Sequence, residues 1–227
     1  MFIGHYAVAL AAKKAAPKTS LGTLFLSAQF LDLLWPIFLL SGWEHVRIDP
    51  GNTAFTPLDF YDYPITHSLI MAIVWSLAFG LIYFFRRHYM RGAWILGFGV
   101  FSHWLLDFIA HRPDLPIFPG SGTNAGLGLW NSVPATILVE STLFIVGLIL
   151  YLRATTARDH IGRNAFWAFI AFTALFYVGN VFSRQQPPSN VTVLAVGGLS
   201  QWLIVPWTYW IDRHRQYATD AMALAAP

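Results

Sequence analysis

Apolar residues run in six long stretches along this chain, and shorter polar connections separate them. A helix needs about 20 predominantly apolar residues to cross the hydrocarbon core of a bilayer. The six stretches approach or exceed that length; they are residues 21–40, 66–85, 93–110, 130–152, 164–182 and 191–211. The pattern predicts an all-α polytopic membrane protein with six transmembrane helices.

Basic residues gather in alternate connections. They are Lys13, Lys14 and Lys18 before the first stretch, Arg86, Arg87 and Arg91 after the second, Arg153, Arg158 and Arg163 after the fourth, and Arg213 and Arg215 after the sixth. The other connections are poor in cations. Because cytoplasmic loops of membrane proteins carry an excess of Lys and Arg, this alternation predicts that both termini are cytoplasmic.

The composition supports a membrane protein. Hydrophobic residues make up 56% of the 227 residues and charged residues only 11%, whereas soluble domains carry about 25% charged residues. A net charge of +3 without a clustered basic face argues against nucleic acid as a partner. The absence of cysteine excludes disulfides and thiolate metal sites. We expect one membrane-embedded helical domain over residues 1–227.

Residues 1–12 form a further apolar segment that is too short to cross the membrane. Eight residues separate His5 from Lys13, which is roughly 12 Å along a helix. If Lys13 lies at the membrane surface, a short helix inserted into the protein places His5 near the middle of the membrane. The alternative is an amphipathic helix that lies on the surface. We favour the inserted half-helix.

The third stretch carries a polar stripe. His103, Asp107 and His111 follow one another at intervals of four, so they share one face of a helix that is otherwise apolar. Imidazole nitrogens and carboxylate oxygens are common ligands of divalent metals. The alternative is a structural network of hydrogen bonds between helices.

Other ionisable residues also fall within the stretches or at their ends. They are Asp32, His67 and Glu140, and no Lys or Arg accompanies them. A buried carboxylate without a cationic partner is costly in a membrane, so it must be protonated, paired with charged His or bound to a metal. A proton relay uses the first two solutions. The number of imidazoles beside the carboxylates favours a metal.

Two local features concern the first stretch and the connection after it. Pro36 is expected to kink the first helix, because proline leaves a backbone carbonyl without its donor. Residues 41–65, rich in Pro, Asp and aromatic residues, are too long for a simple connector. We expect this loop to fold over a site at the outer end of the spans.

Four short motifs, taken in order, resemble those of a known family. They are Gly4-His5, an Asp late in the first long stretch (Asp32), Thr66-His67-Ser68, and Ser102-His103 followed by Asp107. This order resembles the membrane-bound predicted metal-dependent hydrolases, a family that includes an SOS-regulated inner-membrane protein of enteric bacteria. The ligand order also resembles that of zinc-dependent phospholipase C. The resemblance covers residues 1–120.

The resemblance implies an integral protein of a bacterial inner membrane that hydrolyses phosphoester bonds with a metal-activated water. The substrate would be a lipid or a lipid-linked molecule. The implied metal ligands are His5, Asp32, His67, His103 and Asp107, which would bind one or two divalent ions. Zinc is the expected ion and manganese the alternative. Asp107, His111 and Glu140 are candidates for catalytic roles, with His111 and Glu140 as a further ligand, a general acid or a group that orients a ligand.

Two other classes of function fit the same residues. A transporter or permease would use the buried acids to move protons or a metal ion. A scaffold would use the polar stripe only to orient its helices.

Overall fold

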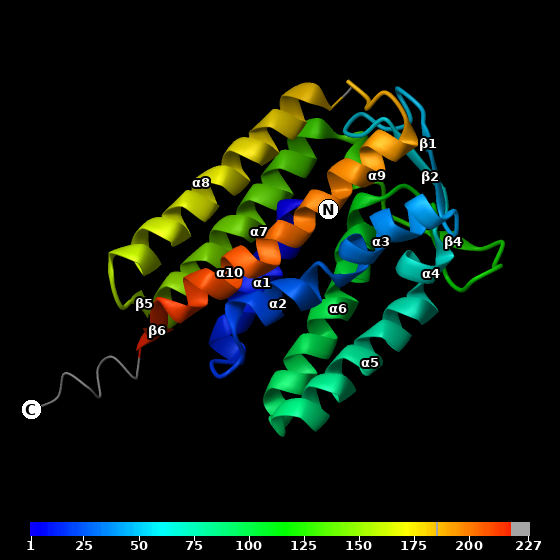
Figure 1. The fold of residues 1–227 in the computed structure, drawn as a ribbon. Coiled ribbons are helices and arrows are strands. Elements are labelled where there is room, and N and C mark those ends of the chain that lie inside the picture. Colours follow the sequence, from blue (N-terminus) through cyan, green and yellow to red (C-terminus); the bar gives the residue numbers. More distant parts are fainter. Residues whose placement is uncertain (185, 219–227) are drawn as a thin grey trace, which may run out of the picture.

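The computed structural model describes residues 1–184 and 186–218 and shows a bundle of helices (Figure 1). The α-helices are α1 (Ile3–Ala15), α2 (Leu21–Ala28), α3 (Phe30–Ser41), α4 (Pro64–His67), α5 (Leu69–Arg87), α6 (Met90–Ala110), α7 (Val133–Ala154), α8 (His160–Ser183), α9 (Val191–Leu199) and α10 (Ile204–Arg213). Short 3-10 helices η1 (Leu129–Asn131) and η2 (Ser200–Leu203) lie before α7 and between α9 and α10. The predicted all-α class is confirmed at this level.

Five segments are long and apolar enough to cross a membrane within the described residues: α5, α6, α7, α8 and the run from α9 to α10. A sixth is obtained if α2 and α3 are taken as one bent span. These segments are typical of an integral membrane protein. The cytoplasmic placement of both termini stays a prediction, and the C-terminal residues 219–227 lie outside the described part.

The first predicted span is broken into α2 and α3, which meet at an angle of 56°. The break lies at Gln29, while Pro36 lies inside α3, so Pro36 does not mark the break. In an unbroken helix the Ala28 carbonyl would accept a hydrogen bond from the residue four positions later. Here it accepts one from the His103 ring instead.

The N-terminal helix α1 is inserted into the protein. It packs against α7, α2 and α6, and His5, Tyr6 and Leu10 are buried. Gly147 of α7 allows the close approach, because a Cβ there would lie 2.5 Å from the Ala7 carbonyl oxygen. The surface-lying alternative for this segment is therefore excluded, and His5 reaches the interior.

Three two-stranded antiparallel sheets complete the described fold and lie at opposite ends of the bundle (Figure 1). Strands β1 (His45–Ile48) and β2 (Leu58–Asp62) pair at one end, where β3 (Leu115–Pro116) also pairs with β4 (Asn124–Ala125). We call this the capped end. Strands β5 (Thr155–Ala157) and β6 (Arg215–Tyr217) pair at the other end.

The long loop 41–65 packs against the helices at the capped end. Its Phe60 ring lies 4.9 Å from the ring of His111 and 6.1 Å from that of Trp130. The Phe55 amide donates to the Trp130 carbonyl at 3.0 Å. The loop thus covers the end of α6 that carries the polar stripe, as the sequence predicts.

Candidate metal centre

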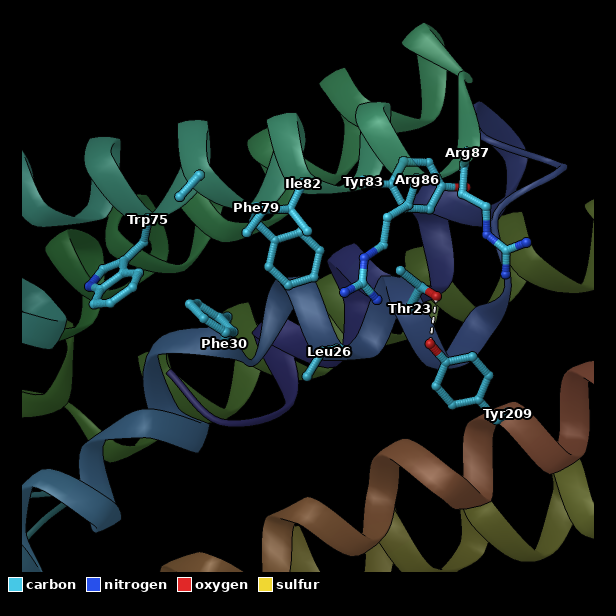
Figure 2. Close-up of a pocket in the computed structure, with 11 residues that line it drawn as sticks. Thr23, Leu26, Phe30, Trp75, Phe79, Ile82, Tyr83, Arg86, Arg87 and Tyr209 are labelled. Carbon is cyan, nitrogen blue, oxygen red and sulfur yellow. Dashed lines mark hydrogen bonds between the residues drawn. The ribbon is translucent and has the colours of Figure 1, made fainter.

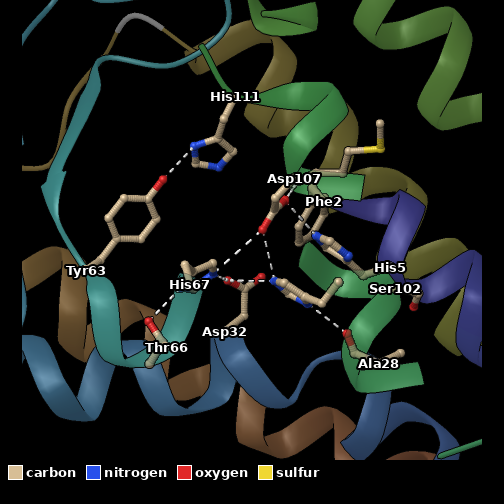
Figure 3. Close-up of polar contacts among 12 residues, drawn as sticks. Phe2, His5, Ala28, Asp32, Tyr63, Thr66, His67, Ser102, Asp107 and His111 are labelled. Atoms are coloured by element: carbon tan, nitrogen blue, oxygen red, sulfur yellow. Dashed lines mark hydrogen bonds and ion pairs between the residues drawn. The ribbon is translucent and has the colours of Figure 1, made fainter. Parts of the chain in front are cut away.

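Five side chains from four separate helices meet below the capped end (Figure 3). His5 comes from α1, Asp32 from the first turn of α3, His67 from α4, and both His103 and Asp107 from α6. Two groups of three could each hold a metal ion: His5, His103 and Asp107, and Asp32, His67 and His103. Within each group the ligand atoms lie within 4.8 Å of one another. The segments are up to a hundred residues apart in the sequence, so the tertiary fold creates this cluster.

Asp32, His67 and His103 form the second of these groups, and Asp107 also lies beside it. Asp32 Oδ1 lies 3.5 Å from Nε2 of His67 and 3.5 Å from Nε2 of His103. Asp107 Oδ2 lies 3.7 Å and 3.2 Å from the same two nitrogens. Two imidazole nitrogens therefore face two carboxylates at distances of 3.2–3.7 Å, at or beyond the upper limit of ordinary hydrogen bonds.

His5 lies on the other side of Asp107. Its Nε2 is 3.2 Å from Asp107 Oδ1, and its ring stacks on the ring of His103 with centroids 3.7 Å apart. The Met1 amino group also contacts Asp107 Oδ1. The two oxygens of Asp107 thus serve different partners, and this carboxylate is placed to bridge two adjacent sites.

Hydrogen bonds fix which nitrogen of each ring faces the centre. His103 Nδ1 donates to the Ala28 carbonyl at 2.8 Å. In the neutral ring Nε2 then carries a lone pair, and no described group forms a hydrogen bond with it. A lone pair that faces carboxylate oxygens is repelled by them unless the ring is protonated or a cation lies between them.

A chain of hydrogen bonds orients the ring of His67, as the Ala28 carbonyl orients the ring of His103. His67 Nδ1 donates at 2.6 Å to Thr66 Oγ1, which donates at 2.7 Å to Glu44. Glu44 also accepts the backbone amides of Ile65 and Thr66, each at 2.7 Å. Burial raises the pKa of Glu44 above its ordinary value, although nearby His67 and these hydrogen bonds act against the rise. The arrangement matches the carboxylate partners that commonly orient metal-binding histidines.

The cluster is buried except at Asp32. His5, His67, His103 and Asp107 are between 0% and 4% exposed, whereas the Asp32 side chain is 27% exposed. No lysine or arginine of the described residues forms an ion pair with the cluster. The donor set fits a divalent cation, and Asp32 marks the edge by which a small molecule could reach it.

His111 belongs to a separate group above the cluster (Figure 3). Its Nδ1 lies 2.9 Å from Asp114 Oδ1 and 3.3 Å from the Tyr63 hydroxyl. Tyr63 donates to the same Asp114 oxygen at 3.0 Å. Burial, with the charge of Asp114, raises the pKa of Tyr63 well above its ordinary value, so this hydroxyl keeps its proton.

Glu140 is fully buried but binds the start of α1. It accepts the backbone amides of Phe2 at 2.9 Å and Gly4 at 3.4 Å. These amides have no partner inside the helix, and a carboxylate is favourable at a helix N-terminus. Glu140 therefore fixes the segment that carries His5, while a catalytic role for Glu140 or His111 stays a prediction.

Three of these contacts have no signal in the sequence: those of Glu44, of Asp114 and of the Ala28 carbonyl. Glu44 and Asp114 lie in loops whose path depends on the tertiary structure, and the Ala28 carbonyl becomes free only through the break at Gln29. Tyr63 lies three residues before Thr66, at the end of the loop that the sequence predicts to fold over the site.

Comparisons with protein families, with curated proteins and with solved structures return no match. The resemblance to the membrane-bound hydrolases therefore remains an inference from the four motifs.

Proposed function

We propose that this protein is a membrane-embedded, metal-dependent hydrolase of phosphoester bonds. The observation that carries the proposal is the meeting of two imidazole lone pairs with two carboxylates in a buried cluster. Zinc accepts both ligand types. Manganese is the alternative, because two of these four ligands bind through oxygen.

The five proposed ligands form two adjacent sites that share Asp107. Asp32, His67, His103 and Asp107 would hold one ion, and His5 with Asp107 would hold a second. A metal in such a site lowers the pKa of a bound water and polarises a phosphoryl oxygen. The Ala28 carbonyl and the Thr66–Glu44 relay keep the two Nε2 atoms directed to the centre.

We assign to His111 the transfer of a proton in this reaction. When Nδ1 donates to Asp114, Nε2 is left as the basic nitrogen of the ring. A carboxylate behind an imidazole also stabilises the charged ring that forms when it takes a proton. The reaction class requires a group to protonate the leaving alcohol, and His111 supplies it.

The surroundings favour a lipid or lipid-linked substrate. The cluster lies against α6 and the bent pair α2 and α3, which are apolar enough to cross a membrane, and Asp32 at its edge is partly exposed. A substrate with an apolar chain and a phosphoester head would match both environments.

One observation favours a transporter as the second candidate. The bent pair α2 and α3 places Asp32 three residues after a break in the span, and broken helices form the ion sites of many transporters. In that case the His–Asp pairs would carry protons or a metal ion across the membrane.

The test combines metal analysis, hydrolysis and flux. The detergent-purified protein should contain a divalent metal and cleave phosphodiester lipids. Asp32→Asn should lose both properties, whereas Asp49→Asn, a matched change at an exposed acid of the loop, should keep both. Metal or proton flux in vesicles without hydrolysis of any phosphoester would establish the transporter instead.

A further inference from the structure

A cavity of about 610 Å³ lies between α2, α3, α5 and α10, away from the metal cluster (Figure 2). This volume is within the range of small-molecule sites in proteins. Its walls belong to segments that are apolar enough to cross a membrane. Aromatic rings line one end of the cavity and arginines line the other, and this difference indicates which kind of molecule the cavity binds.

Aromatic rings form one end. The Phe30 ring lies 5.7 Å from that of Trp75 and 5.3 Å from that of Phe79. Trp75 is held by a hydrogen bond from its Nε1 to the Ile65 carbonyl at 2.9 Å. Phe30 and Ile65 each lie two residues before a predicted metal ligand, so these rings stand between the cavity and the cluster.

The other end carries Arg86 and Arg87, in the last turn of α5 (Figure 2). Both are exposed, and neither forms an ion pair or a side-chain hydrogen bond with another described residue. A pair of hydroxyls, Thr23 and Tyr209, lies at the same end, with their oxygens 2.7 Å apart. This end offers two guanidinium groups to an anion, beside hydroxyls of Thr23 and Tyr209 that bond one another.

The distance between the ends matches one leaflet of a bilayer. From Trp75 to Arg86, α5 rises by about 16 Å at 1.5 Å per residue. Half of a hydrocarbon core about 30 Å thick is about 15 Å. A chain that extends from the arginines to the aromatic end therefore spans the apolar part of one leaflet.

We propose that this cavity binds one anionic glycerophospholipid of the surrounding membrane. Its phosphate accepts hydrogen bonds from Arg86 and Arg87, whose planar guanidinium groups suit phosphate oxygens. One acyl chain lies along Leu26, Ala78 and Phe79 and ends at Phe30 and Trp75. Arg86 and Arg87 lie in the last turn of α5, while His67 precedes its start. This lipid site is therefore distinct from the metal cluster and does not depend on the proposed hydrolysis.

The test measures lipid binding to the full-length protein in detergent by native mass spectrometry. The probes are phosphatidylglycerol, phosphatidylcholine with the same acyl chains, and glycerol phosphate without chains. We expect retention of phosphatidylglycerol in preference to phosphatidylcholine, and no retention of glycerol phosphate. Basic residues near a membrane surface contribute about fivefold each to anionic lipid binding. The double variant Arg86→Gln/Arg87→Gln should therefore weaken binding about thirtyfold.

Two further variants separate this site from general attraction of anionic lipid. Arg91→Gln removes an exposed arginine that does not line the cavity and should leave binding unchanged. Ala78→Phe fills the cavity without changing charge and should reduce binding at least tenfold. Equal losses for Arg91→Gln and the double variant, or full binding by Ala78→Phe, would overturn the proposal, as would binding of glycerol phosphate alone.

Discussion

At the scale of single residues, function depends on which nitrogen of each imidazole is free. The hydrogen bonds from His103 to Ala28 and from His67 to Thr66 leave both Nε2 atoms as lone-pair donors. Reversing either ring would direct an N–H at the centre and remove a ligand. The groups behind the histidines are therefore as important for metal binding as the histidines themselves.

Thr66→Val tests this directly. The change keeps the shape of the side chain but breaks the relay from His67 to Glu44 and leaves a buried carboxylate with fewer donors. Loss of such a partner usually lowers metal affinity by about 10- to 100-fold. Titration with zinc should show this loss, with the number of ions bound at saturation unchanged. Ser76→Ala, which removes a hydroxyl bonded only within α5, serves as the control.

Asp114→Asn tests the role of His111. The amide keeps a hydrogen bond to Nδ1 but removes the charge that stabilises the protonated ring. We expect kcat for hydrolysis to fall by about 100-fold or more, while the metal content stays at the wild-type level. Loss of metal in this variant would show that the His111 group is part of the metal site rather than a proton donor.

At the scale of elements, two close contacts place the ligands. The break between α2 and α3 turns Asp32 towards α6 and frees the Ala28 carbonyl. The approach of α1 to α7 at Gly147 brings His5 to Asp107. Apolar patterning predicted both helical segments, but it contained no sign of the break, because Gln29 lies in a stretch with the composition of one continuous span.

Gly147→Ala should displace α1, because the added methyl group would meet the backbone of Ala7. Overpacking of this kind usually costs about 1–3 kcal/mol. The variant should unfold at a lower temperature and bind the second metal ion, on the His5 side, more weakly. Gly179→Ala is the matched control: a Cβ there meets no atom within 4 Å, so stability should stay level or rise.

The start of α8 gives a prediction about pH. Asp159 caps α8 through the Gly162 amide and lies 2.7 Å from His214 Nδ1. The hydrogen bond from His214, followed by that from Gly162, lowers the pKa of Asp159 below its ordinary value of 3.8. A lowered pKa means that the ionised carboxylate stabilises the fold above pH 3.8 and that this contribution disappears as the pH falls through the lowered value.

Asp159→Asn keeps a capping oxygen but removes the charge. Thermal unfolding should show a less stable variant at neutral pH and equal stabilities at pH values below the lowered pKa. A difference that persists unchanged in acid would contradict this prediction, because it could not come from the charge of the Asp159 carboxylate.

At the scale of the whole molecule, the sequence predicted the helical class, the inserted N-terminal helix and the loop that covers the capped end. Apolar length and the placement of charges can be counted directly along the sequence, and a membrane tolerates few departures from either pattern. The relays behind the ligands could not be predicted, because Glu44 and Asp114 lie in loops without periodic patterns. Asp32, His103 and Asp107 stand out in the sequence because ionisable residues without Lys or Arg are rare in apolar spans, whereas His5 and His67 joined the proposed ligands through the resemblance of the four motifs.

The candidate metal cluster lies near the start of α5, and the arginines of the proposed lipid cavity lie at its end. Each site has its own ionisable groups, and the rings of Phe30, Trp75 and Phe79 lie between the two sites. The five metal ligands and the two arginines should therefore act independently. Changes at Arg86 and Arg87 should leave the metal content of the purified protein unaltered.

The central claim is that a divalent metal bound by Asp107 stabilises this fold. Its most direct test is thermal unfolding of the wild type and Asp107→Asn, each with zinc and with a strong chelator. At zinc concentrations 100-fold above the dissociation constant, binding contributes about 2.7 kcal/mol. This corresponds to a shift of about 5–10 °C for a chain of this size. We predict that the chelator lowers the midpoint of the wild type by this amount, and that Asp107→Asn is less stable in zinc and insensitive to chelator. A wild type indifferent to chelator, together with a variant of equal or greater stability, would contradict the account and identify Asp107 as a proton-carrying acid whose buried charge costs stability.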